Sequence, residues 1–144
     1  MNTLPEDLSG LTDRGAIKVL ITSFGALHQD PPSGDAITVD LTKALHNPHT
    51  DPKMRTLTGL DHAVRRHMET TPGSRAVVER TVDRVLAAMA YHDGHGELTE
   101  VHVYCQGGRH RSVWVAEETA AHLRALGIGV EVEHRHIFRG VVQP

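Results

Sequence analysis

The sequence predicts a single α/β domain, three-layer-like in organisation, with helices packed on a mostly parallel sheet of about four strands. Two observations lead to this fold class. Four short segments have the apolar pattern of strands, at 16–24, 36–41, 101–105 and 130–137. Segments with apolar residues at helical spacing lie between them, two after the second strand and one after the third. Strands that alternate with helices favour a parallel sheet.

Composition narrows the function classes. The 144 residues suffice for one domain with a real core, and the formal net charge of −3 gives no general electrostatic reason to bind nucleic acid or a membrane. Cys105 is the single cysteine, which excludes an internal disulfide and fits a reducing compartment, so we expect a cytoplasmic protein. We expect neither a signal peptide nor a membrane-spanning segment.

The N-terminal half begins with a polar stretch. Residues 1–14 predict a flexible leader ahead of a ligand-binding domain at 15–144. The first strand, 16–24, has aliphatic residues at most positions, as in a largely buried strand. Residues 25–35 are rich in proline and glycine and predict a surface loop before the second strand at 36–41.

Two helices are expected next. Residues 46–57 form a loop that contains two prolines, which fix its path. Thr58 is placed to cap a helix that runs to about Glu69, with Asp61 completing a weak capping box.

The remaining elements follow the same logic. Ser74 is placed to cap a second helix that runs to about Tyr91, and 92–96 predicts a turn into the third strand. The last strand spans 130–137, and 140–144 predicts a tail.

The richest chemistry lies at 105–112, between the third strand and a helix that runs from Val113 to a stop at Gly127. Amides at a helix N-terminus lack partners within the helix and carry partial positive charge. Gly107 and Gly108 let the backbone approach an anion closely. The side chains that could donate to it are Arg109, Arg111 and Ser112. This combination predicts a phosphate site.

Ligands of parallel α/β sheets collect beyond the carboxyl ends of the strands. The loops after Phe24, Asp40 and Cys105 should therefore open on one edge of the sheet.

Four stretches carry a resemblance to a known family. They are Ser23-Phe24-Gly25, residues 47–55 (NPHTDPKMR) with 57–61 (LTGLD), residues 105–113 (CQGGRHRSV) with Ala116-Glu117, and His134-Arg135. On these stretches the chain resembles the C-terminal domain family of the RNase adapter protein RapZ. The resemblance covers residues 19–139, in the same order and at compatible spacing.

The resemblance implies a sensor of an amino-sugar phosphate, glucosamine-6-phosphate, that presents small regulatory RNAs to an endoribonuclease. It implies that the phosphate lies at residues 105–112, and the residues expected there are Gln106, Gly107, Gly108, Arg109, His110, Arg111 and Ser112. It implies that the sugar contacts Asp40, Asn47 and His49. We expect no cofactor and no catalytic residue, hence a binding domain rather than an enzyme, and a homo-oligomer is possible within this family.

Departures from the family pattern bear on the partners. The sequence has no Gly-x-x-x-x-Gly-Lys-Ser/Thr motif, so ATP hydrolysis by a phosphate loop is not expected. Leu41-Thr42 follows Asp40 where the family has Val-Arg, and Gln106 replaces a threonine. The basic C-terminal cluster is reduced to Arg135 and Arg139, the residues assigned to RNA, which should weaken RNA binding.

Two rival functions remain open. One is an RNA-binding adapter for a small RNA or an RNase. The other is a cysteine-dependent phosphatase, since Cys105 and Arg111 have the spacing of a loop that wraps one phosphate above a thiolate. Against it, Tyr104 precedes the cysteine where histidine is usual, and no general-acid loop is evident. The twelve histidines include close pairs, but without cysteine partners or a His-Glu-x-x-His helix we predict no metal site.

Overall fold

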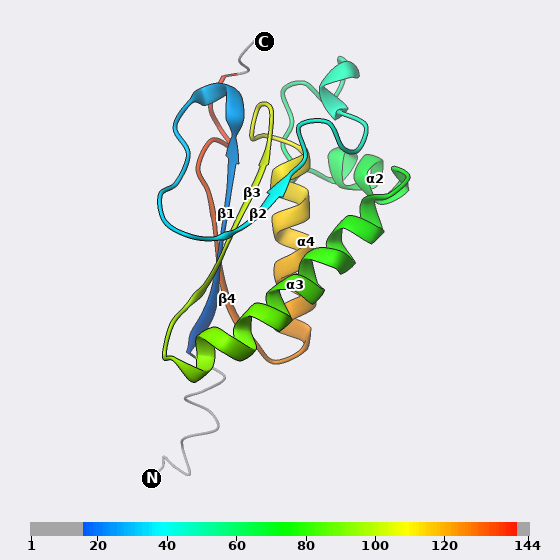
Figure 1. Ribbon diagram of the computed structural model, residues 1–144. Coiled ribbons are helices and arrows are strands. Elements are labelled where there is room, and N and C mark those ends of the chain that lie inside the picture. The colour runs from blue at the N-terminus through cyan, green and yellow to red at the C-terminus, as the bar shows by residue number, and fades with distance from the viewer. Residues whose placement is uncertain (1–15, 141–144) are drawn as a thin grey trace.

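The computed structural model describes residues 16–140. Four parallel strands form one sheet in the order β2-β3-β1-β4 (Figure 1). Their bounds are Ile17–Gly25 for β1, Ile37–Asp40 for β2, Thr99–Cys105 for β3 and Gly129–His134 for β4. The predicted α/β class with about four parallel strands is confirmed. The predicted leader, 1–14, lies outside the described residues.

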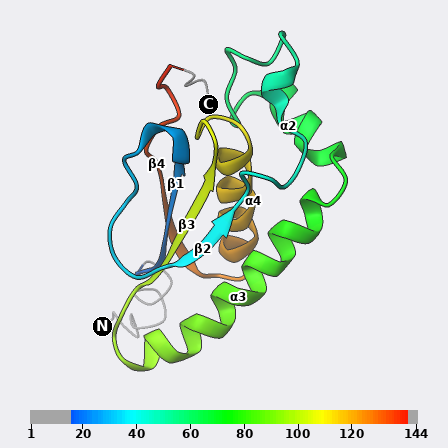
Figure 2. The same cartoon turned by 45° about the horizontal axis from the view of Figure 1, so that its top comes forward.

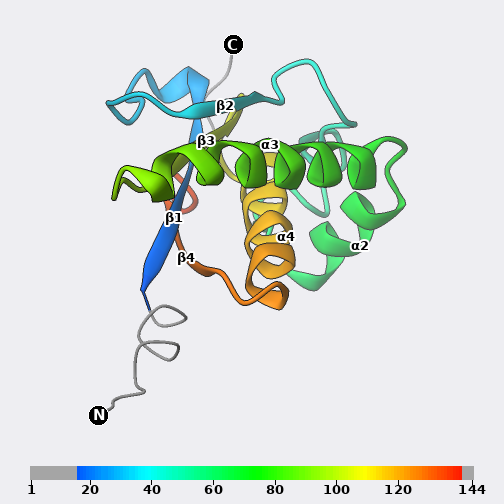
Figure 3. The same ribbon diagram turned by 60° about the horizontal axis from the view of Figure 1, so that its bottom comes forward.

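The three α-helices of the described residues lie together on one face of the sheet (Figures 1 and 3). The α-helices are α2 at His62–Thr70, α3 at Ser74–Gly94 and α4 at Arg111–Ala125, and the short 3-10 helices are η1 at Ala26–His28 and η2 at Pro48–Thr50. The described residues therefore form a sheet with a single layer of α-helices.

The core lies between this helical layer and the sheet. Successive side chains of a strand point to opposite faces, so the buried residues Val19 and Ile21 of β1 and Val101 and Val103 of β3 line the helical side. From α4, Trp114, Ala120 and Leu123 pack against them with at most 1% of each residue exposed. Burial of this apolar surface is the main force that fixes α4 on the sheet.

Helix α2 begins later than predicted. Its first residue is His62 and its N-cap is Asp61, not Thr58. The backbone N–H of Thr58 donates to the Asp61 carboxylate at 2.7 Å, so the two residues of the predicted capping box do bind each other. They close a turn ahead of the helix instead of its first turn.

Other helix and strand boundaries also differ from the predicted ones. Ser74 is the first residue of α3, and the cap is Gly73 with φ of +88°. Helix α3 continues to Gly94, so much of the turn predicted at 92–96 is helical. Strand β4 ends at His134 rather than near Ile137, because the chain then turns and Arg139 N–H donates to the His136 carbonyl at 3.1 Å.

The carboxyl ends of the strands meet at one edge of the sheet, as predicted. Gly25 is in register with Cys105, and Asp40 with Tyr104. Figure 2 brings this edge forward and shows the connections that leave β1, β2 and β3 side by side. Along residues 16–140, no helix combines the length and apolar character needed to cross a bilayer.

Candidate functional site

The connection between β3 and α4 is pressed against the end of β1. Gly108 has φ of +73°, and a Cβ atom on it would lie 2.4 Å from the Gly25 nitrogen. A Cβ atom on Gly25 would lie 2.4 Å from the Gly107 carbonyl carbon. Glycine is required at positions 25 and 108 because two backbones touch there.

Cys105 lies beneath this connection. Its thiol is buried, the Gly108 N–H donates to Sγ at 3.2 Å, and the Ser112 hydroxyl is also 3.2 Å from Sγ. These two contacts curve residues 105–112 around the sulfur.

Three consecutive side chains fasten the connection between β2 and α2, which we call the 41–57 loop. Arg111 is 3% exposed, and its Nη1 donates to the carbonyls of Leu41 at 2.8 Å and Ala44 at 3.1 Å. His110 Nε2 donates to the Met54 carbonyl at 2.9 Å. Burial lowers the pKa of His110, which keeps the ring neutral with its proton on Nε2.

Arg109 completes this group. Its Nη2 donates to the Thr56 carbonyl at 2.7 Å and its Nε to the Leu57 carbonyl at 3.0 Å. Its Nη1 donates to the Arg139 carbonyl at 2.9 Å. All three basic side chains of the predicted phosphate loop thus bind main-chain carbonyls elsewhere in the chain.

Two buried polar atoms near the loop have no hydrogen-bond partner among the described residues, Arg111 Nε and His49 Nδ1. His49 is also close enough to His110 for its charge to depress the pKa of His110, although burial is the larger cause. Buried polar atoms in native structures nearly always have a partner, so such atoms mark places where a ligand or water belongs.

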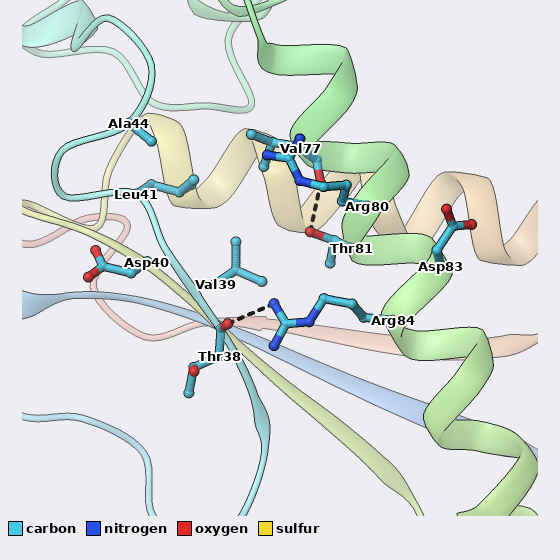
Figure 4. A pocket seen from close by; sticks show the side chains of 10 residues that line it. All are labelled: Thr38, Val39, Asp40, Leu41, Ala44, Val77, Arg80, Thr81, Asp83 and Arg84. Atoms are coloured by element: carbon cyan, nitrogen blue, oxygen red, sulfur yellow. Dashed lines mark hydrogen bonds between the residues drawn. The ribbon is translucent and has the colours of Figure 1, made fainter.

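A cavity of about 410 Å³ lies between β2 and α3 (Figure 4). Its lining residues are Thr38, Val39, Asp40, Leu41, Ala44, Val77, Arg80, Thr81, Asp83 and Arg84. Arg84 Nη1 donates to the Thr38 carbonyl at 3.0 Å. The sequence reasoning missed Arg80 and Arg84, although basic residues four positions apart on a helix share one face and could have indicated them.

Asp40, predicted to contact the sugar, is the last residue of β2 and lies beside this cavity. Its Oδ1 accepts from the Thr42 N–H at 2.8 Å and from the Thr42 hydroxyl at 2.6 Å. These hydrogen bonds hold the pKa of Asp40 below its usual value, so the carboxylate is ionised near neutral pH. Burial, with Asp40 close by, raises the pKa of Tyr104.

Of the remaining residues near the site, some line the cavity and others lie away from it. Leu41 and Ala44 line the cavity on one side and bind Arg111 through their carbonyls, so the cavity adjoins the α4 N-terminus. Asn47 and His49 do not line it. Asn47 Oδ1 instead accepts the His49 N–H at 3.1 Å and caps η2. The main-chain carbonyl of Gln106 accepts the N–H of Leu27, a residue of η1, at 3.0 Å.

The residues assigned to RNA lie in the turn after β4, beside the β1–β2 connection. Arg135 Nη2 is 3.0 Å from Asp30 Oδ1, and Arg139 Nη2 is 3.7 Å from Asp30 Oδ2. Part of their positive charge is therefore balanced within the chain. Sequence reasoning did not identify Asp30.

A second polar network joins β1, β4 and α4. His134 lies between Ser23 and Glu117, with Nδ1 2.6 Å from the Ser23 hydroxyl and Nε2 2.7 Å from the Glu117 carboxylate. The hydrogen bond to His134 lowers the pKa of Glu117. Ser23 is fully buried, so this network serves as a structural link. Nowhere in residues 16–140 do three or more His, Cys, Asp or Glu side chains gather in a group that could hold a metal ion.

Comparison with known proteins identifies relatives of this chain. Residues 17–138 match the family model described as the RapZ C-terminal domain. The chain is 39% identical over 142 residues to a nucleotide-binding protein of Rubrobacter xylanophilus, with 95% of this chain and 44% of that protein covered. It is 36% identical over 135 residues to a nucleotide-binding protein of Geobacter sulfurreducens, with 92% of this chain and 46% of that protein covered.

The chain thus spans less than half the length of these curated relatives. The family match, in contrast, extends from the first residue of β1 to beyond the end of β4 and includes the strand–loop–helix connection at Cys105. The chain belongs to the RapZ C-terminal domain family.

Proposed function

We propose that this chain is a ligand-sensing domain that binds a phosphorylated amino sugar such as glucosamine-6-phosphate at the carboxyl edge of its sheet. One observation carries the proposal. Arg80 and Arg84 line the cavity between β2 and α3, and the ionised carboxylate of Asp40 lies at its edge, directed away from the two guanidinium groups (Figure 4). An amino-sugar phosphate carries one cationic and one anionic group, and this edge of the sheet offers charges of both signs. The volume of about 410 Å³ is in the range of small-molecule sites.

The phosphate end is assigned to the α4 N-terminus. Within the described residues, the N–H groups of Gly107, Ser112 and Val113 donate to no backbone carbonyl outside their own helix or strand. A helix N-terminus with free amides favours an anion. The unpartnered Nε of Arg111 supplies a buried donor next to the cavity wall at Leu41.

The sugar end is assigned to Asp40. One of its oxygens is occupied by Thr42, which stands where the family has arginine, and the carboxylate can accept from an ammonium or hydroxyl group. His49 and Asn47 are proposed to act from the 41–57 loop, with the free Nδ1 of His49 as a donor or acceptor.

A calorimetric titration tests the assignment. Arg80→Ala should weaken binding of glucosamine-6-phosphate by about tenfold, which corresponds to about 1.4 kcal/mol. Arg75→Ala is the matched control, because Arg75 lies on the same helix and binds Glu118 at 3.4 Å outside the cavity. Equal effects of the two substitutions would remove the cavity from the proposal. A nucleotide titrated in parallel covers the binding stated in the names of the longer relatives.

A cysteine-dependent phosphatase is the second candidate. The observation that favours it is the pair of contacts from the Gly108 N–H and the Ser112 hydroxyl to Cys105 Sγ, which would stabilise a thiolate. Two features favour the sensor instead. Cys105 is 2% exposed, and Arg111 directs Nη1 toward the Leu41 and Ala44 carbonyls.

We propose that residues 15–144 act as the ligand-binding domain in the cytoplasm, with residues 1–14 as a leader. We further propose that any contact with RNA or an RNase is weak unless a homo-oligomer brings several copies of Arg135 and Arg139 together, because Asp30 balances these arginines.

A further inference from the structure

The carboxylate of Asp30 lies within a ring of donors from the turn after β4. Arg135 contacts it through Nη2 at 3.0 Å and through Nε at 3.3 Å. His136 Nε2 is 3.3 Å from Oδ2, and Arg139 Nη2 is 3.7 Å from the same oxygen. We call these four residues the Asp30 cluster. Hydrogen bonds from Arg135, with His136 next, lower the pKa of Asp30 to about 2.

The donors are held in place by contacts that do not involve the Asp30 side chain, and one of these contacts is from Arg135 Nε to the Asp30 main-chain carbonyl at 2.8 Å. His136 is fully buried, and its Nδ1 accepts the Gly25 N–H at 2.9 Å, which fixes the proton on Nε2 and aims it at Asp30. The Arg135 backbone N–H donates to the Ser23 carbonyl at 2.9 Å, which extends the sheet contact past β4. Removing the Asp30 side chain therefore leaves an organised set of donors.

This donor set has the chemistry of an oxyanion site. Two guanidinium groups and one imidazole N–H converge on oxygen atoms, the arrangement that proteins use for carboxylate and phosphate groups. The side chains of Arg135 and Arg139 are 34% and 54% exposed, so an anion from solution can reach both.

We propose that Asp30 is an internal ligand that masks a phosphate-binding surface formed by Arg135, His136 and Arg139. A phosphate group from outside the chain, free or part of a polyanion, competes with Asp30 for these donors. Asp30 lies in the β1–β2 connection, so its displacement requires movement of that connection only.

The Asp30 cluster touches the residues proposed to hold the sugar phosphate. His28, two positions before Asp30, packs against His136 with ring centroids 4.5 Å apart and the rings tilted by 37°. Its Nε2 donates to the Gly107 carbonyl at 3.2 Å. Movement of Asp30 would therefore also disturb the contact between His28 and residues 105–112. The proposal of a masked surface does not, however, require that the sugar phosphate binds there.

The test compares Asp30→Asn with Asp35→Asn. Both raise the net charge by one and both lie in the β1–β2 connection, but only Asp30 contacts the donors. Asp30→Asn should bind phosphate groups about fivefold more tightly than wild type, as expected for loss of exposed ion pairs, and Asp35→Asn should not. Adding Arg135→Ala to Asp30→Asn should abolish the gain. Equal gains in the two single variants would mean that net charge alone acts, and would overturn the proposal.

Two probes separate the possible sources of phosphate. Inorganic phosphate, followed by the NMR signals of His136 and Arg135, reports a free anion, and a single-stranded oligonucleotide in fluorescence anisotropy reports a phosphodiester chain. Tighter binding of either probe by Asp30→Asn, but not by Asp35→Asn, supports the masked surface and identifies the source of the phosphate. If neither probe binds more tightly, the proposal is overturned. If Asp30→Asn does not fold, judged by thermal unfolding, Asp30→Ser carries the same expectation.

Discussion

The Nη1 atom of Arg111 lies 2.8 Å from the carbonyl oxygen of Leu41, so the first residue of α4 holds the segment that leaves β2. This contact joins the two halves of the proposed ligand site, because Leu41 lines the cavity and Arg111 begins the helix whose N-terminus is assigned to the phosphate.

Arg111→Ala should weaken glucosamine-6-phosphate binding by about 1.5–3 kcal/mol, the usual value of a hydrogen bond to a charged group. It should also lower the free energy of unfolding, since the carbonyls of Leu41 and Ala44 lose a charged donor. Calorimetry and chemical denaturation measure the two effects. Arg111→Lys keeps the positive charge but not the planar guanidinium group with its several donors. It should therefore recover only part of the ligand affinity and part of the free energy of unfolding. Unchanged affinity in Arg111→Ala would contradict the phosphate assignment.

Gly108→Ala should be strongly destabilising. A left-handed backbone alone costs a non-glycine residue about 1–2 kcal/mol, and the new Cβ would lie 2.4 Å from the Gly25 nitrogen. Gly107→Ala is the matched control, because a Cβ there meets nothing within 4 Å. Midpoints of thermal unfolding should separate the two variants clearly. If both behave alike, the contact between the two backbones is not what fixes this connection.

Cys105→Ser distinguishes the sensor from the phosphatase. For the sensor, the wild-type protein should not hydrolyse p-nitrophenyl phosphate, and the serine variant should bind glucosamine-6-phosphate nearly as well as wild type. The measurements are a chromogenic assay and a titration. Hydrolysis that disappears in Cys105→Ser would establish the second candidate and displace the first.

Stability should fall as the pH drops below about 6.5, the ordinary pKa of histidine. Burial lowers the pKa values of His102, His110 and His136 in the folded protein. Between the unfolded and folded pKa values, the unfolded chain therefore binds more protons than the folded chain, and falling pH favours unfolding. The stabilisation is complete above the unfolded pKa and is lost toward the folded pKa. Urea titrations between pH 5 and 8 measure the slope.

His136→Gln should flatten this slope relative to wild type. His62→Gln, at an exposed position at the start of α2, serves as the control and should leave it unchanged. A slope that is the same in all three proteins would mean that His136 is not held neutral by burial beside the Gly25 N–H.

RNA binding should be weak at about 150 mM salt, where surface charge is heavily screened. Arg135 and Arg139 already contact Asp30, so few cations remain to neutralise RNA phosphates at this surface. Gel shifts with structured small RNAs measure the affinity. Tight binding that resists salt would show that other cations, or an oligomer, supply the missing charge.

Much of the fold was predictable because it rests on local patterns. The strand at Val101 to Cys105 and the helix that ends before Gly127 follow from side-chain periodicity, and so does the common edge of the strand ends. The start of α2 was misjudged because Thr58 and Asp61 do bind each other, and a sequence does not show whether such a pair closes a turn or a helix.

Long-range contacts account for what the sequence did not show. Arg80 faces β2 from a helix that follows some forty residues later in the chain, and Asp30 meets Arg135 across a separation of 105 residues. The spacing of Arg80 and Arg84 places both on one face of α3, but no periodic pattern shows which distant segment either pairing involves. The roles of Arg109 and His110 were unpredictable for the same reason, because their partners are backbone carbonyls rather than recognisable side chains.

That last feature bears on how the site could change during evolution. Arg109, His110 and Arg111 hold the 41–57 loop almost entirely through its main chain, at Leu41, Ala44, Met54, Thr56 and Leu57. Every residue type carries the same carbonyl, so many side chains of this loop can be exchanged while its course stays the same. Lineages could thus acquire a different ligand preference by substitutions in the loop, without rebuilding the scaffold that presents it.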